Sequence, residues 1–268
     1  MTTKSVRAVR FDAGTPTQAE DAVTVEAPLQ IRVNGAAFTT TMRTPGDDCP
    51  LARGLLFTEG IVTDRAVKPE YKEISDPETG LVSCLEVTVP EGLVEKEVEG
   101  RRTTLSASSC GMCGTRDPAD IEIYGPPLSM GTDQAFDIGL VPGMLAALQA
   151  GQTTFEQSGG SHAAGLFTIG GELLALYEDI GRHNAVDKTI GHLLDTQKLD
   201  AAQCLMVSGR VSYEIVYKAY RAEIPILAAV SAPSSMAVET AQRLGMTVIG
   251  FCRDTRATVY STQDNVAG

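Results

Sequence analysis

The sequence lacks any run of about 18 apolar residues, the length at which a segment becomes a candidate membrane-spanning helix. Its first residues also lack the apolar stretch of a secretory signal. We therefore expect a cytoplasmic protein with no membrane partner. Internal repeats and low-complexity tracts are absent too, so 268 residues of 43% apolar composition predict a globular protein with one large or two modest domains.

Basic side chains are scarce, with 22 Lys and Arg against 34 Asp and Glu and a formal net charge of −12. Proteins bind nucleic acid phosphates through clustered Lys and Arg, so we expect no nucleic-acid partner. The excess of acidic over basic side chains is uneven along the chain, because residues 160–268 contain nearly as many basic as acidic side chains. The second half of the chain can therefore accommodate an anion.

A second pair of closely spaced cysteines is also missing. Of the six cysteines, only Cys110 and Cys113 form a CxxC pair, and glycines lie on the inner and outer flanks of that pair. Such glycines favour an exposed, sharply bent loop in which a thiolate can form. Three uses fit the pair: part of a structural zinc site, a dithiol redox couple, or a nucleophilic sulfur that carries a group.

The rest of the sequence disfavours two of these three uses. A zinc site needs about four ligands, and His162 follows the pair without the Glu found two residues on in the zinc deaminase signature. A thioredoxin-like CxxC begins a helix, which Gly111, Gly114 and Pro118 disfavour. A sulfur carrier is favoured, in which a thiolate accepts a sulfane sulfur as a persulfide; zinc binding remains an alternative, and we predict no metal site.

Three regions are predicted from the apolar periodicity. They are a flexible N-terminal arm (1–20), a smaller α+β domain that ends in the cysteine loop (21–125) and an α/β domain (126–268). In the α+β domain, Asn34-Gly35 predicts a hairpin turn, and a helix of about 14 residues should follow Pro45. Strands are expected over residues 70–107.

The order of elements in the second half indicates a sheet covered by helices. We expect a hairpin about Gly170-Gly171, a helix from Asn184, and then alternating strands and helices up to a strand at 246–251. This ββαβαβαβ order predicts a three-layer αβα domain with a mostly parallel mixed sheet. A helix over 138–151 should bridge the two halves.

Four loops rich in small residues, at 178–184, 208–210, 231–235 and 250–254, are expected where ligands gather in open α/β sheets, beyond the strand carboxyl ends. They contain three arginines and several hydroxyls, which suit pyrophosphate and predict a nucleotide-like anion. The alternative for each loop is ordinary helix capping without a ligand. The candidate contacts in these loops are Arg182, His183, Ser208, Gly209, Arg210, Ser231, Gly250, Cys252, Arg253 and Asp254.

Eight ordered motifs resemble one known family. They lie at residues 27–35, 42–48, 108–114, 162–164, 178–188, 208–214, 231–235 and 250–253. Together they span about residues 25–260, and the chain resembles the formate dehydrogenase accessory sulfurtransferase family, FdhD/NarQ. The resemblance implies a cytidine-deaminase-like second domain without the deaminase metal ligands, and a homodimer.

The same resemblance implies a function. Members take sulfur as a persulfide from a cysteine desulfurase and deliver it to the molybdenum cofactor, in its bis(molybdopterin guanine dinucleotide) form, for the catalytic subunit of formate dehydrogenase. Cys110 would carry the persulfide and Cys113 would assist. Residues 250–255, including Thr255, match the cofactor-binding stretch, in which Phe251 would cover the site. The main rival is a non-catalytic chaperone of the same cofactor.

Overall fold

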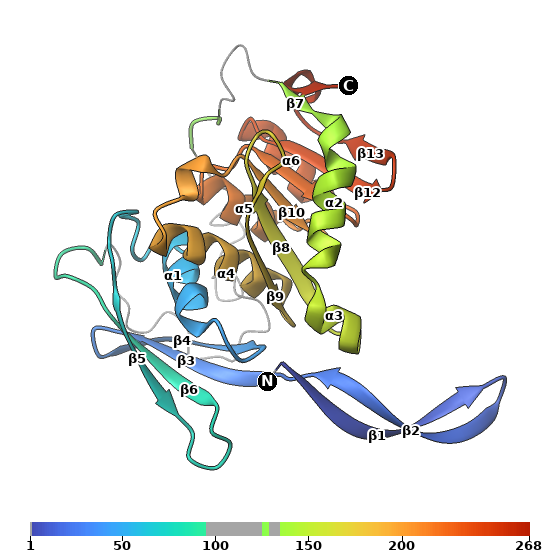
Figure 1. Ribbon diagram of the computed structural model, residues 1–268. Helices are drawn as coiled ribbons and strands as arrows, with labels where there is room; N and C mark the ends of the chain where they lie inside the picture. The colour runs from blue at the N-terminus through green and yellow to red at the C-terminus, as the bar shows by residue number, and fades with distance from the viewer. Residues whose placement is uncertain (1, 95–124, 129–134) are drawn as a thin grey trace.

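The computed structural model describes residues 2–94, 125–128 and 135–268 of the chain (Figure 1). Within them lie two two-stranded sheets, a four-stranded sheet and a six-stranded sheet. None of the helices in these residues is long and apolar enough to cross a membrane.

The four-stranded sheet has the order β4-β3-β6-β5 and is packed on one helix, α1. Its elements are β3 (Ala27–Val33), β4 (Ala36–Arg43), α1 (Asp48–Thr58), β5 (Glu70–Ser75) and β6 (Val82–Thr88). The turn between β3 and β4 falls at Asn34-Gly35, both with positive φ as a type I′ hairpin turn requires. The predicted hairpin and helix are confirmed, although α1 has 11 residues rather than 14.

The six-stranded sheet has the order β13-β12-β11-β10-β8-β9. Its strands and the helices around them are α2 (Val141–Ala150), α3 (Thr153–Ser158), β8 (His162–Phe167), β9 (Leu173–Asp179), α4 (Arg182–Asp195), β10 (Cys204–Val207), α5 (Tyr213–Arg221), β11 (Ile226–Ala229), α6 (Ser235–Arg243), β12 (Thr247–Arg253) and β13 (Arg256–Val259). Short 3-10 turns lie at Ile138–Leu140, Leu199–Ala201 and Gln263–Asn265, and β7 (Phe136–Asp137) pairs with β14 (Val266–Ala267).

The sheet is mixed, but the expectation that it would be mostly parallel is wrong. Only β10–β11 and β11–β12 are parallel, whereas β8–β9, β8–β10 and β12–β13 are antiparallel. The two hairpins explain most of the difference, because a tight turn at Gly170-Gly171 or after Arg253 can only join antiparallel strands. Strands β10, β11 and β12 form a parallel centre, because helices α5 and α6 connect them as crossovers.

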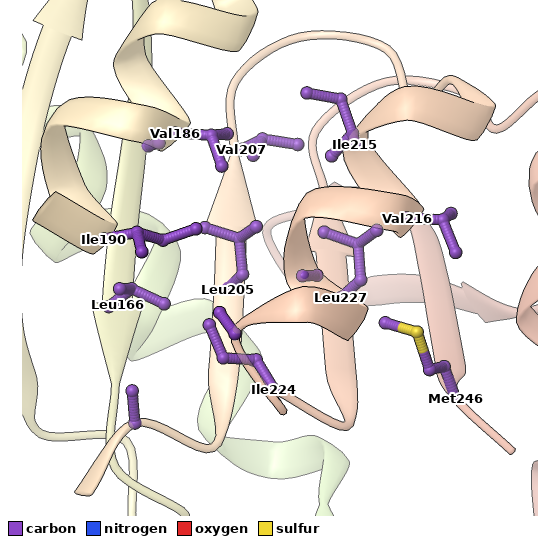
Figure 2. Close-up of a cluster of buried hydrophobic side chains, with 14 of the residues drawn as sticks. Leu166, Val186, Ile190, Leu205, Val207, Ile215, Val216, Ile224, Leu227 and Met246 are labelled. Carbon is purple, nitrogen blue, oxygen red and sulfur yellow. The ribbon is translucent and has the colours of Figure 1, made fainter. Parts of the chain in front are cut away.

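Helices cover both faces of this sheet, as predicted. Helices α4, α5 and α6 pack on one face, and α2 covers the other (Figure 1). Figure 2 shows the first interface, where apolar side chains of β8, β10 and β11 meet those of α4 and α5. The labelled side chains there are Leu166, Val186, Ile190, Leu205, Val207, Ile215, Val216, Ile224, Leu227 and Met246.

Residues 2–20 contain regular structure that the sequence did not predict, while the flexibility of this arm stays a prediction. Strands β1 (Thr3–Asp12) and β2 (Thr15–Thr24) pair along their whole length in a hairpin that projects from the body (Figure 1). Its base is held on α3 by a hydrogen bond between Thr24 Oγ1 and Ser158 Oγ of 2.7 Å. Most of its side chains are exposed, so the apolar alternation that marks a half-buried strand is missing from its sequence.

The two halves of the chain meet where α1 crosses α4. A Cβ at Gly54 would overlap the carbonyl oxygen of Asp187, and a Cβ at Gly191 would overlap that of Pro50. Two glycines thus allow the helix backbones to touch. Lys218 on α5 adds a buried connection, since its Nζ lies 2.8 Å from both carboxylate oxygens of Asp187 and donates to Thr58 Oγ1 of α1 at 3.0 Å.

Candidate ligand-binding rim

One edge of the six-stranded sheet brings the predicted loops together, and we call it the rim. Strands β9, β10, β11 and β12 end there, and β8 begins there because it runs antiparallel to β9 and β10. Helices α4, α5 and α6 start at this edge, after Gly181, Ser212 and Ser234. The first turns of helices leave backbone N–H groups free, which favours an anion at this edge.

Asp179 fixes the start of α4. Its buried carboxylate accepts hydrogen bonds from the backbone N–H groups of Thr44 at 3.1 Å and Gly181 at 2.8 Å, and it pairs with Lys188 Nζ at 2.9 Å. Burial raises the pKa of Asp179, and the Lys188 ammonium opposes this change. Because Thr44 lies in the first half of the chain, both halves build this part of the rim.

Arg182, Gly209 and His162 form the centre of the rim. A Cβ added to the buried Gly209 would lie at ordinary van der Waals distance from both side chains, 3.4 Å from His162 Nδ1 and 3.6 Å from Arg182 Cβ, so the two side chains lie next to each other at this glycine. Arg182 Nε is buried and has no hydrogen-bond partner among the described residues. Burial lowers the pKa of the half-buried His162, and the positive charge of Arg182 lowers it further.

Two other predicted residues of this part, His183 and Ser208, already have protein partners. His183 Nε2 lies 2.6 Å from Glu214 Oε2 and 3.4 Å from Ser212 Oγ. Ser208 Oγ accepts the backbone N–H of Ala163 at 2.9 Å. Glu214 was missed as a site residue by sequence reasoning; its place in the first turn of the predicted helix after the 208–210 loop was the available signal.

Ser231, Gly250 and Phe251 form a second cluster at the ends of β11 and β12. Phe251 has a φ of +53° and donates its backbone N–H to the Ser231 carbonyl oxygen at 3.1 Å. A Cβ at Gly250 would lie 3.2 Å from that oxygen and 3.0 Å from the ring of Tyr260. A left-handed conformation at a bulky residue costs on the order of 1–3 kcal/mol and occurs most often at functional sites.

The remaining residues predicted to contact a ligand differ in their exposure to solvent. Arg253, Asp254 and Thr255 are exposed at and after the end of β12, and Arg210 is exposed beside Gly209. Cys252 is different, because it is fully buried in the apolar cluster under α2. Arg253 is therefore exposed to solvent, whereas Cys252 is buried among apolar side chains.

Cys110 and Cys113 lie outside the described residues. The other four cysteines all have pKa values above the ordinary range for a thiol, with burial as the largest cause. For Cys49 the pKa rises to about 11, because the nearby carboxylates of Glu73, Asp48 and Asp195 add to the effect of burial. None of these four thiols is therefore set up to form a thiolate near neutral pH.

The fold and the rim define an α/β protein with a mixed, helix-covered sheet, and one solved structure shares that fold. It is a crystal structure of a protein assigned as a formate dehydrogenase accessory protein in Desulfotalea psychrophila. The two chains are covered completely, with a TM-score of 0.77 and 20% sequence identity. At that identity the likeness concerns the fold alone, and the cytidine-deaminase-like topology stays a prediction.

Sequence comparison identifies the family. The FdhD/NarQ family model matches residues 24–267. A protein of Mycolicibacterium paratuberculosis is 39% identical, with 97% of each chain covered, and one of Sulfolobus acidocaldarius is 38% identical, with 99% of each chain covered. Both relatives are named sulfur carrier protein FdhD. The chain belongs to the FdhD/NarQ family, as its motifs predict.

Proposed function

We propose that this protein is a cytoplasmic sulfurtransferase that serves formate dehydrogenase. It receives sulfur from a cysteine desulfurase as a persulfide on Cys110 and passes it to the molybdenum cofactor in its bis(molybdopterin guanine dinucleotide) form. The cofactor is a substrate that the protein releases, and the receiving partner is the catalytic subunit of formate dehydrogenase. We expect the protein to act as a homodimer.

The observation that carries the proposal is the name shared by curated relatives that match over nearly the whole chain. Proteins 37–40% identical, from organisms as different as Streptomyces coelicolor and Anaeromyxobacter dehalogenans, are named sulfur carrier protein FdhD. A carrier needs a nucleophilic sulfur, and the sequence contains one closely spaced pair of cysteines to supply it.

The environments of the other four cysteines make them unsuitable as sulfur carriers, which supports Cys110 and Cys113 in that role. Cys204 and Cys252 are fully buried, and Cys49 and Cys84 are partly buried with raised pKa values. A protonated thiol attacks a persulfide far more slowly than a thiolate does. Sulfur should therefore be carried by the CxxC pair.

The transfer step is an exchange at sulfur. The Cys110 thiolate attacks the terminal sulfur of the desulfurase persulfide, a new S–S bond forms on Cys110, and the desulfurase cysteine leaves as a thiolate. The same exchange in the opposite sense delivers the terminal sulfur to the acceptor and restores the Cys110 thiolate. We propose that Cys113 assists by attacking the terminal sulfur of the Cys110 persulfide, so that the new S–S bond forms on Cys113, Cys110 leaves as a thiolate and the protein undergoes no net oxidation.

The rim suits the guanine dinucleotide part of the substrate. The buried Arg182 Nε lacks a partner among the described residues, and a bridging phosphate oxygen can accept its hydrogen bond. Three helix N-termini at the same edge of the sheet favour negative charge. We propose that Phe251 and Arg253, at the end of β12, cover and contact the same ligand.

The test is mass spectrometry of the protein after incubation with a cysteine desulfurase and cysteine. We expect the peptide containing Cys110 to gain the mass of one sulfur, roughly 32 Da, in a form that thiols remove. Cys110→Ala should lose this gain, while Cys49→Ala should keep it. Sulfur on another cysteine, or full maturation of formate dehydrogenase by Cys110→Ala, would contradict the proposal.

The same variants separate a carrier from a chaperone. If Cys110→Ala still binds the cofactor but yields an inactive formate dehydrogenase, sulfur transfer is required. If it binds the cofactor and yields active enzyme, the protein acts by binding alone. Stoichiometric zinc that is lost with Cys113→Ser would instead indicate a zinc site.

A further inference from the structure

His162 and Arg182 lie side by side in the rim, since a Cβ added at Gly209 would be 3.4 Å from His162 Nδ1 and 3.6 Å from Arg182 Cβ. Arg182 Nε is buried and has no hydrogen-bond partner among the described residues. The His162 side chain is half-buried. A ligand bound beside Gly209 can therefore contact both side chains.

The groups facing His162 come from three surrounding elements. Arg182 and His183 lie on α4, Asp179 ends β9, and Arg210 follows β10. Arg182, Arg210 and His183 disfavour a positive charge on His162, in addition to its burial, while Asp179 favours one. Burial is the largest cause of the lowered pKa of His162, and the positive groups add to it, while Asp179, which is paired with Lys188, opposes it.

We propose that His162 is a proton-linked contact of the ligand: it is neutral in the free protein and takes up one proton from solvent when a bridging diphosphate binds beside Arg182. The inference rests on the proposed function, which places the diphosphate of a guanine dinucleotide at the rim. It adds a residue and a pH dependence that the proposed function does not contain.

The physical reason is a reversal of the local charge. A diphosphate diester carries two negative charges, and near His162 these outweigh the repulsion from Arg182 and Arg210. A protonated His162 can then donate a charge-assisted hydrogen bond to a phosphate oxygen. His183 is less available to a phosphate oxygen, because its Nε2 already lies 2.6 Å from Glu214 Oε2.

The experiment is isothermal titration calorimetry with diguanosine diphosphate, whose bridging phosphates have no proton that titrates near neutral pH. Titrations at about pH 7 in two buffers of different ionisation enthalpy give the number of protons taken up on binding. We expect uptake to approach one proton per site, and affinity to fall by up to about tenfold for each pH unit above neutrality.

Two substitutions assign the proton. His162→Gln should bind more weakly at low pH, take up no proton and show a flat pH profile, and His162→Asn provides a second neutral variant if the first folds poorly. His192→Gln is the matched control, because His192 lies in the last turn of α4, away from the rim at the start of that helix, and its Nδ1 contacts the Tyr177 hydroxyl at 3.0 Å. It should keep the uptake of the unmodified protein.

The outcomes distinguish this inference from the proposed function. Binding without proton uptake, or uptake that persists in His162→Gln, overturns the role of His162 and leaves the rim as the binding site. No binding of the dinucleotide at any pH overturns both the role of His162 and the proposed role of the rim. Persulfide formation on Cys110 is measured separately and depends on neither result.

Discussion

The environment of each side chain in this protein determines whether it stays protonated and unreactive or is available for chemistry. Cys49 is the clearest case, because its Sγ lies 3.9 Å from Glu73 Oε1 and its pKa is raised to about 11 by burial and neighbouring carboxylates. A thiol in that environment is a poor nucleophile at neutral pH.

This environment predicts the labelling behaviour of Cys49. Alkylation by iodoacetamide at about pH 8 should be slow compared with that of an ordinary exposed cysteine, and it should accelerate as pH rises toward the pKa. Glu73→Gln removes a charge that raises the pKa, so it should lower the pKa and speed the reaction. Peptide mass spectrometry of the labelled protein gives the rate.

Glu70→Gln is the control for that experiment, since Glu70 lies on the same strand but is not among the groups that shift Cys49. It should leave the labelling rate of Cys49 unchanged. Equal acceleration by both substitutions would mean that the general charge of the strand, rather than the contact with Glu73, sets the reactivity.

At the residue level, sequence motifs predict which loops hold polar groups but not how each group is paired. His183 and Ser208 were predicted as ligand contacts, yet the structure shows each with a protein partner, Glu214 and the Ala163 N–H. Such pairs join residues far apart in sequence, and a pattern of residue types has no information on their distance. The positive φ of Phe251 is likewise visible only in the folded chain.

At the level of helices and strands, buried elements were predicted well and the exposed hairpin was not. The predicted helix from Asn184 and strand at 203–208 correspond to α4 and β10, because their apolar side chains face a core on a regular period. Hairpin β1–β2 has solvent on both faces, so its sequence has no such period. The prediction of parallel strands was wrong where a short turn joins two consecutive strands.

The β1–β2 hairpin should contribute little to stability. None of its residues belongs to the three buried apolar clusters found in the described residues, and its side chains Val9 and Phe11 are exposed. Deleting residues 2–22 should change the melting temperature by no more than about 2–4 °C, which corresponds to about 1 kcal/mol in a protein of this size. Differential scanning calorimetry measures the change.

Sulfur loading and diphosphate binding of the shortened protein provide the functional control. Both should be unchanged, because the rim lies on β8 to β12 and not on the hairpin. A fall of ten degrees or more would show that the hairpin is held by more than its contacts with α3.

On the scale of the whole molecule, the two halves should unfold as one unit. Helix α1 packs on α4, and the buried Lys218 contacts both Asp187 and Thr58 across the two halves. These contacts make it unfavourable for one half to unfold while the other keeps its buried charges unpaired.

Substitution of Gly191 tests this coupling. A Cβ there would overlap the Pro50 carbonyl oxygen and lie 2.6 Å from Gly54 N, and both are backbone atoms that cannot rotate away. Gly191→Ala should therefore lower the free energy of unfolding by about 1–3 kcal/mol, despite the higher helix propensity of alanine. Urea unfolding followed by circular dichroism measures the loss.

Gly143→Ala is the matched control, because Gly143 is also helical but no atom lies within 4 Å of an added Cβ. It should stabilise the protein by about 0.5–1 kcal/mol. If both substitutions stabilise the protein, α1 and α4 do not pack as closely as described.

The contact between Thr44 and Asp179 also bears on how such a protein can be recombined. The strands and helices of the rim come from the second half of the chain, yet Asp179 accepts the Thr44 N–H, and Lys188 donates to the Thr44 carbonyl oxygen at 3.1 Å. A chimera that joined residues 126–268 to an unrelated first half would leave this carboxylate and ammonium short of partners. The two halves must therefore be inherited, or exchanged between relatives, as a matched pair.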